Sequence, residues 1–301
     1  MPRKPRRADD YRDAITAASR SGLAEIMTAL GAYRDALVLI GGWAPHLILE
    51  RFGYTGFVLD TGVLGADRLG GVVHVGSIDI DLVVDPVVID AEQYATIVEL
   101  LLDRGYETTK ESLFQFERLL RSPRDGQEYL IRVDLLTPAP LRGQGWARRH
   151  RAVQRDLRAR VLPGAEVALA HWFWYELDAR LPDGAGTRVR LKVADVVASL
   201  ALKGIAIGER YAEKDAYDIY TLCAFVQGGP AAVADAIRPF VAEGPVERGL
   251  KSIGDKFRAL DAEGPAWVAA FLGAGHQEER DRLQQDAFMT VQEVVRLVGA
   301  S

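Results

Sequence analysis

The chain divides into two halves by the way its hydrophobic residues are spaced. In the first half, short apolar runs stand between polar and glycine-rich turns, a pattern that predicts strands. From residue 193 onward, apolar positions recur at helical spacing, which predicts a succession of helices. We therefore expect a mixed α+β fold in which a sheet domain precedes a helical C-terminal domain.

The same patterns locate the individual elements and the domain boundaries. We predict a basic tail at 1–10, an α/β domain at 11–190 and a helical domain at 191–301. We expect the aromatic run 167–175 to lie in the core. The predicted strands are 36–40, 77–84, 114–119, 129–136 and 189–192. The predicted helices are 11–33, 43–52, 90–104 (capped by Asp90), 193–207, 213–227, 230–242, 246–260, 264–272 and 277–299.

The strand 77–84 carries two carboxylates in an otherwise apolar run. Asp79 and Asp81 are two residues apart, so in a strand they share one face while Ile80 and Leu82 line the other. Two like charges side by side repel each other, and a bound cation such as Mg²⁺ removes that penalty. Asp134 is a third carboxylate within an apolar strand. The alternative for all three is the solvated face of an edge strand.

A double glycine follows the apolar run 36–40 and precedes the predicted helix 43–52. Gly41 and Gly42 let the backbone take unusual angles, and a helix that starts there presents unpaired N–H groups to a phosphate. A tight strand-to-helix turn is the structural alternative. The sequence contains neither a P-loop nor a dinucleotide fingerprint at this point.

A second group of charged residues lies on the predicted helices of the second half. Lys203 stands in a strongly apolar helix, where a lysine is rarely buried unless it is paired. Asp215 and Asp218 are three residues apart at the start of the next helix and share one face of it. They also suit a helix N-terminus electrostatically. Lys203 either reaches water along its stem or forms a salt bridge with one of these aspartates.

Overall charge and composition add less to this picture. Although the formal net charge is −5, the chain contains a basic cluster of Arg148, Arg149, Arg151 and Arg155. This cluster is a candidate site for binding RNA, and the alternative is a solvated surface. Cys223 is the only cysteine, so no intramolecular disulfide forms, and its apolar helical surroundings predict a buried thiol. No apolar run is long enough to span a membrane and the start has no signal-peptide pattern, so we expect a cytoplasmic protein.

The order of these motifs resembles the nucleotidyltransferase superfamily of the DNA polymerase beta type. The segments 41–46 (GGWAPH), 77–82 (SIDIDL) and 214–220 (KDAYDIY), with Lys203, look more narrowly like the AbiEii/AbiGii family of nucleotidyltransferase-like toxins. The resemblance covers roughly residues 36–220. Two features depart from it, because Gly42 replaces a common serine and because a long glycine-rich stretch separates the two motifs of the first half.

The resemblance implies a role for each matching residue. Two Mg²⁺ ions would be held by Asp79, Asp81 and Asp134, and the catalytic group would further include Lys203, Asp215 and Asp218. Asp134 or Asp79 would act as the base. Contacts to the nucleotide would come from Gly41, Gly42, Ser77, Lys203 and Lys214.

The implied function is transfer of a nucleotide from an NTP to an acceptor. The acceptor would be RNA such as tRNA, and the protein would be a toxin of a toxin–antitoxin or abortive-infection system with a cognate antitoxin as partner. A small-molecule acceptor of the aminoglycoside kind, a protein acceptor, or a non-catalytic nucleotide-binding module are the alternatives.

Overall fold

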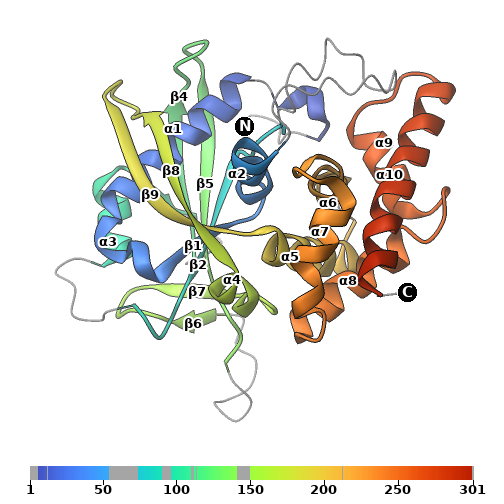
Figure 1. Ribbon diagram of the computed structural model, residues 1–301. Coiled ribbons are helices and arrows are strands. Elements are labelled where there is room, and N and C mark those ends of the chain that lie inside the picture. Colours follow the sequence, from blue (N-terminus) through green and yellow to red (C-terminus); the bar gives the residue numbers. More distant parts are fainter. Residues whose placement is uncertain are drawn as a thin grey trace. The chain divides into compact units, whose positions relative to one another are not determined.

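A computed structural model describes residues 6–11, 13–53, 74–89, 96–109, 112, 114–140, 150–211 and 213–299. The chain divides into two compact units. The sheet unit comprises Arg12–Trp43 and Ser77–Ala194, and the helical unit comprises Lys4–Tyr11, Ala44–Gly76 and Asp195–Ser301. The predicted mixed α+β class is confirmed (Figure 1).

Within the described residues, the sheet unit is built on one mixed sheet of nine strands. Its main path runs β3-β4-β5-β2-β1-β9-β8, and β7 pairs with both β5 and β6. β2 is antiparallel to β1 and parallel to β5, so it lies in the interior of the sheet. The strands are β1 (Leu37–Ile40), β2 (Asp79–Val84), β3 (Glu107–Thr108), β4 (Gln115–Arg121), β5 (Glu128–Thr137), β6 (His150–Ala152), β7 (Arg158–Val161), β8 (Trp172–Arg180) and β9 (Gly186–Ala194).

The burial of the central strands follows from their residues. All four residues of β1 are buried, as expected for an apolar strand with neighbours on both sides. In β2, Ile80 and Leu82 are fully buried while Asp79 and Asp81 are half-buried, so the predicted alternation is confirmed. The apolar face of the sheet packs against α1 (Asp13–Ala29), which contacts β5, β8 and β9 (Figure 1).

In the described part of the sheet unit three shorter helices accompany α1, and one of them corrects the prediction. They are η2 (Gly31–Ala36), α3 (Ile97–Asp103) and α4 (Glu166–Ala170). The cap of α3 is Thr96 rather than Asp90: its side chain accepts from the Glu99 N–H at 3.2 Å, and the Glu99 carboxylate accepts from the Thr96 N–H at 2.8 Å. Asp90 itself lies outside the described residues.

The helical unit contains the helices that the periodicity predicts. They are α2 (Trp43–Phe52, whose first residue belongs to the sheet unit), α5 (Val196–Glu209), α6 (Glu213–Phe225), α7 (Gly229–Ile237) continued by η3 (Arg238–Phe240), α8 (Gly244–Lys256), α9 (Glu263–Phe271) and α10 (Gln277–Val298). The short turn η1 (Ala8–Asp10) also belongs to it.

Glycines allow two of these helices to touch backbone to backbone. A Cβ added at Gly204 of α5 would lie 2.3 Å from the carbonyl oxygen of Gly249 in α8, and one added at Gly249 would lie 2.4 Å from the carbonyl oxygen of Ala201. Cys223 of α6 is buried, as predicted. None of the helices in the described ranges is both long enough and apolar enough to cross a membrane.

The region after residue 140 departs most from the prediction. The run 167–175 forms α4 and the start of β8, and only part of it is core: Tyr175 is buried, whereas Trp172, Phe173 and Trp174 are half-buried. Side chains alternate along β8, so Trp172 and Trp174 face away from the side that packs against α1, whereas Phe173 shares the face of Tyr175. The short strands β6 and β7 of this region, like β3 before it, carry too few apolar residues to give a sequence signal.

Candidate functional site

Strand register brings the predicted carboxylates of the sheet unit into one row. Asp81 of β2 is the direct partner of Asp134 in β5, and on its other side it is paired with Ile40 of β1. Gln115 of β4 is the direct partner of Asp134. Directly opposed residues on neighbouring strands share a face, so Gln115, Asp134 and Asp81 form a continuous polar row that ends beside the glycine turn. We call these three residues the carboxylate row.

The glycine turn is shaped around Asp81. Gly41 has a φ of 69°, in the left-handed region that glycine adopts without strain. A Cβ at this position would lie 1.9 Å from the Asp81 Oδ2, so the carboxylate packs directly against the Gly41 Cα. The chain therefore requires glycine here twice over, once for the backbone angle and once for the close approach of Asp81.

Asp134 is oriented by a residue that the sequence analysis did not single out. The Gln115 side-chain amide donates to Asp134 Oδ1 at 2.7 Å. Both residues are half-buried, so this bond lies at the boundary between solvent and core. Gln115 is one of several polar residues of β4, and only its register with Asp134 reveals its role.

Asp79 lies two residues before Asp81 on β2, beside a basic residue of the neighbouring strand. Its direct partner in β5 is Arg132, which in turn is paired with Glu117 of β4. The Arg132 Nε lies 3.4 Å from the Glu117 Oε2. The three strands thus present acidic, basic and acidic side chains in a second row parallel to the carboxylate row.

A buried serine links the glycine turn to the β2 motif. The Trp43 Nε1–H donates to the Ser19 hydroxyl at 3.0 Å, and that hydroxyl donates to the Ile78 carbonyl at 3.2 Å. Ser19 and Trp43 are both fully buried. The Ser19 hydroxyl of α1 is therefore hydrogen-bonded both to Trp43, which follows Gly42, and to Ile78, which precedes Asp79. α1 contains several other polar residues, including Ser21, so nothing in the pattern marked Ser19 for this role.

The carboxylates meet the elementary requirement for Mg²⁺. This ion is commonly bound by one or two carboxylates together with substrate phosphates and water, and Asp79 and Asp81 are half-buried on the same face of β2. Within the described ranges, no group of three or more His, Cys, Asp or Glu side chains is arranged to hold a metal ion. The oxygen atoms of Asp79, Asp81 and Asp134 are ligands of the kind that Mg²⁺ accepts, and their role in holding it stays a prediction.

The second predicted group lies within the helical unit and forms a buried ion cluster. The Lys203 Nζ is 2.6 Å from Asp215 Oδ1 and 2.5 Å from Asp218 Oδ2. The expected salt bridge of Lys203 is therefore present, with both aspartates. Lys203 is 9% exposed and Asp218 is fully buried. Burial alone would lower the pKa of Lys203, but Asp215 and Asp218 outweigh it and raise that pKa above its usual value.

Further side chains complete the buried ion cluster. Asp218 Oδ1 lies 3.0 Å from the Lys214 Nζ and 2.8 Å from the His74 Nε2, and Asp215 Oδ2 lies 2.9 Å from the Arg210 guanidinium. Burial raises the pKa of Asp218, yet Lys203, Lys214 and His74 together depress it far below the ordinary range. Burial likewise lowers the pKa of Lys214, against the attraction of Asp218.

His74 is neutral in this cluster. Burial, opposed by Asp218, lowers the pKa of His74 from 6.5 to about 4. The Gly76 N–H donates to the His74 Nδ1 at 3.2 Å, which assigns the ring proton to Nε2, where it is donated to Asp218. The ring also lies 5.3 Å from that of Tyr217. Nothing in the glycine-rich sequence before Ser77 marked His74 as a partner of α6.

The remaining predicted contacts are distributed over the chain. The Ser77 hydroxyl donates to the backbone carbonyl of Asp79 at 2.9 Å. Arg155 is exposed and lies 2.5 Å from Glu99, while Arg151 lies in β6. Arg148 and Arg149 fall outside the described residues. Roles in binding nucleotide or RNA for these residues stay predictions.

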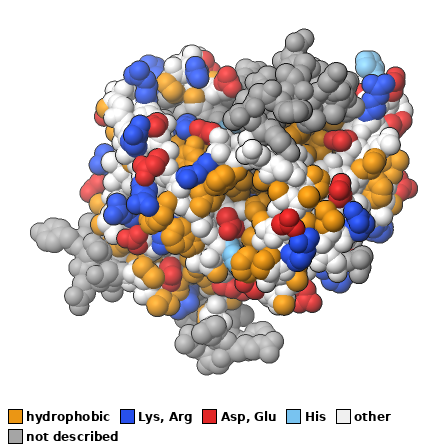
Figure 2. All heavy atoms as spheres, viewed as in Figure 1, with side chains coloured by type: hydrophobic (Ala, Val, Ile, Leu, Met, Phe, Trp, Pro, Cys, Tyr) orange, Lys and Arg blue, Asp and Glu red, His pale blue; other side chains and the backbone are white. Residues whose placement is uncertain are grey.

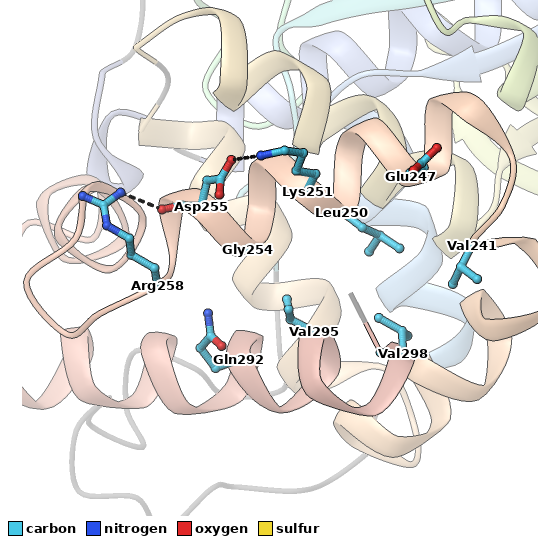
Figure 3. Close-up of a pocket in the computed structure, with 11 residues that line it drawn as sticks. Val241, Glu247, Leu250, Lys251, Gly254, Asp255, Arg258, Gln292, Val295 and Val298 are labelled. Atoms are coloured by element: carbon cyan, nitrogen blue, oxygen red, sulfur yellow. Dashed lines mark hydrogen bonds and ion pairs between the residues drawn. The ribbon is translucent and has the colours of Figure 1, made fainter. Parts of the chain in front are cut away.

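A separate pocket of about 720 Å³ lies in the helical unit between α8 and α10 (Figure 3). Several of its polar side chains bond to protein partners: Lys251 pairs with Asp255 at 2.8 Å, and Arg258 donates to the Asp255 carbonyl at 3.0 Å. Leu250 and Val295 contribute its apolar lining. It contains none of the residues that the sequence analysis singled out.

Comparisons with models of protein families, with curated proteins and with solved structures find no match to this chain. The resemblance to nucleotidyltransferases therefore rests on the motifs of the sequence alone.

Proposed function

We propose that the protein is an Mg²⁺-dependent nucleotidyltransferase that moves a nucleotide from an NTP to RNA such as tRNA. The observation that supports this most directly is the carboxylate row beside Gly41. Two acidic strand residues from β2 and β5 stand directly opposite each other, against a glycine turn with a left-handed backbone. Such an arrangement combines cation ligands with a close approach to the main chain, which is what a triphosphate requires.

In this proposal each element of the sheet unit has a chemical task. Gly41 and Gly42 admit the triphosphate close to the backbone, and Asp79 and Asp81 hold Mg²⁺. When bound, the metal supplies charge stabilisation for the triphosphate and the leaving pyrophosphate. Asp134, oriented by Gln115, accepts the proton of the acceptor hydroxyl while that oxygen attacks the α-phosphorus and the bond to pyrophosphate breaks.

The biological setting proposed with this reaction is a toxin of a toxin–antitoxin or abortive-infection system. The acceptor and the NTP would both be met in the cytoplasm, and a cognate antitoxin would restrain the enzyme. The buried ion cluster of the helical unit would support the fold, because each of its two carboxylates is already paired with two basic side chains.

The deciding experiment incubates the purified protein with Mg²⁺, total cellular RNA and each NTP in turn, radiolabelled at the α-phosphate. We expect label on RNA with one NTP. The double variant Asp79→Asn/Asp81→Asn, which preserves shape while removing charge, should lower transfer by about a hundredfold or more. A matched control is Glu107→Gln, which neutralises an exposed strand carboxylate outside the row and should leave transfer unchanged.

The other outcomes separate the alternatives. Full transfer by the double variant would contradict the proposal. NTP binding without label on RNA would direct the search to small-molecule or protein acceptors. Absence of both NTP binding and transfer would favour a degenerate scaffold that has kept only the fold.

A further inference from the structure

The outward face of the β8–β9 hairpin is a ladder of aromatic and charged side chains. Register pairs Trp174 with Lys192, Glu176 with Arg190 and Asp178 with Arg188. Trp172 lies two residues from Trp174 and therefore shares its face. We call the set Trp172, Trp174, Arg188, Arg190 and Lys192 the aromatic–basic face.

Its members are held against one another. The Lys192 ammonium lies 4.3 Å from the ring centroid of Trp172, and the Arg190 guanidinium carbon lies 4.4 Å from that of Trp174. The two indoles meet edge to face at 5.3 Å. Lys192 also donates to the Asp35 carbonyl at 2.6 Å, which fixes the ammonium over the rings. The indoles and cations are thus positioned before any ligand arrives.

The opposite face of the same hairpin belongs to the buried core of the sheet unit. Tyr175, Leu177, Leu191 and Val193 are buried, and both strands contact α1. The tryptophans alternate with these residues along β8, so they belong to the row that faces away from the packed side. Two large half-exposed indoles on that row are therefore not needed to fill the core.

Charge on the outward row favours an anionic ligand. Two carboxylates, Glu176 and Asp178, accompany four cations, which are Arg180, Arg188, Arg190 and Lys192. The ion pairs of this row are exposed. The side chains of Arg188 and Asp178 are 69% and 65% exposed, and those of Arg190 and Glu176 are 50% and 56% exposed. Pairs this exposed contribute little to stability, so the guanidinium groups can exchange a carboxylate for a phosphate at small cost. Acidic, basic and hydrophobic side chains are mixed over this part of the surface in Figure 2.

We infer that the aromatic–basic face binds a single-stranded segment of nucleic acid. Bases stack on the indoles or on the guanidinium plane of Arg190, while Arg188 and Lys192 contact the phosphates between them. Flat aromatic side chains beside cations on a sheet surface are the combination that recognises unpaired bases with little sequence preference. The assignment of this strand as the acceptor rests on the proposed function, whereas the binding itself does not.

An anionic membrane surface is the competing occupant, since tryptophan and basic residues also favour lipid interfaces. The ladder argues for nucleic acid because each indole lies against a cation of the neighbouring strand, at 4.3 Å for Trp172 and Lys192 and at 4.4 Å for Trp174 and Arg190. A ring and a charge at fixed, adjacent positions match a base and its phosphate better than they match a fluid lipid surface. Binding to oligo(U) and binding to phosphatidylserine vesicles distinguish the two occupants.

The test measures binding of a fluorescent 12-nucleotide oligo(U), without NTP or Mg²⁺, so that loss of nucleotidyl transfer does not affect it. Trp174→Ala should weaken binding about tenfold, because stacking on one ring is lost. Trp174→Phe keeps a smaller ring and should lie between that variant and the wild type. Leu119→Ala, which shortens an exposed apolar side chain on β4, is the control and should bind normally.

A second pair of variants separates stacking from charge. Arg188→Gln/Arg190→Gln should weaken binding and reduce the slope of affinity against salt by about one to two. Lys251→Gln/Arg258→Gln removes two cations from the helical unit and is the matched control. Far-ultraviolet circular dichroism, which reports the backbone rather than the indoles, verifies that each variant is folded.

Three results would overturn the inference. One is equal binding by Trp174→Ala and the wild type. Another is equal competition by heparin and by oligo(U), which would indicate charge alone. The third is binding to phosphatidylserine vesicles with no binding to oligo(U), which would assign the face to a membrane.

Discussion

Two groups of carboxylates in this chain have opposite surroundings. In the sheet unit, Asp81 and Asp134 are half-buried neighbours on parallel strands, beside a glycine turn. In the helical unit, Asp215 and Asp218 are buried and contact three basic side chains between them besides His74. Acidic residues that meet at the boundary with solvent can bind a ligand, whereas those neutralised in the core hold helices together. Sequence motifs marked both groups, and only the surroundings distinguish them.

Loss of Lys203 should have the largest effect on stability, and it tests whether the buried ion cluster holds the helical unit together. Lys203→Met leaves two buried carboxylates without their main cation, so the free energy of unfolding should fall by about 3–5 kcal/mol. Lys251→Met removes one partner of an exposed pair, with 74% and 63% side-chain exposure, and should change stability by less than about 1 kcal/mol. Urea denaturation measures both. If Lys203→Met kept its stability but lost NTP binding, Lys203 would belong with the nucleotide site.

A pH dependence should follow from His74. Its pKa is about 4 in the folded protein and near 6.5 when unfolded, so between these values the unfolded state binds more protons. The stabilising contribution is complete above pH 6.5 and is lost as the pH falls toward 4, by at most about 3 kcal/mol.

Urea denaturation at a series of pH values measures this dependence. His74→Gln keeps a donor toward Asp218 without titrating and should flatten the curve between pH 6.5 and 4. His276→Gln, at the exposed start of α10, should follow the wild type. Parallel curves for His74→Gln and the wild type would contradict the assignment of a buried neutral imidazole.

A substitution at Gly41 should have the smallest effect on stability, and it tests the carboxylate row of the sheet unit. Gly41→Ala introduces a Cβ at a left-handed φ and against Asp81, at a cost of about 1–3 kcal/mol. Gly126→Ala is a close control, because Gly126 has a φ of 71° with nothing within 4 Å of the added carbon. Transfer activity should fall for Gly41→Ala well beyond the control, since Asp81 must move. Equal activity of the two variants would separate Asp81 from the reaction.

Local patterns predicted the elements well, and tertiary pairing accounts for what they missed. Alternation placed Asp79 and Asp81 on one face of β2, and helical spacing located α5 to α10. The pairing of Asp81 with Asp134 was beyond the sequence, because register between strands 50 residues apart depends on the packing of both against their neighbours. Gln115 and His74 were missed for the same reason, since each is defined by a partner far along the chain.

The match between β2 and β5 also restricts how this protein can change over evolutionary time. Deleting or inserting one residue within β5 would turn Asp134 toward the packed face and bring Val133 or Leu135 out of it. The turn at Ser122–Gly126 can absorb changes in length, because Gly126 has open space around it. Related chains should therefore vary in length at that turn while β5 drifts only by substitution.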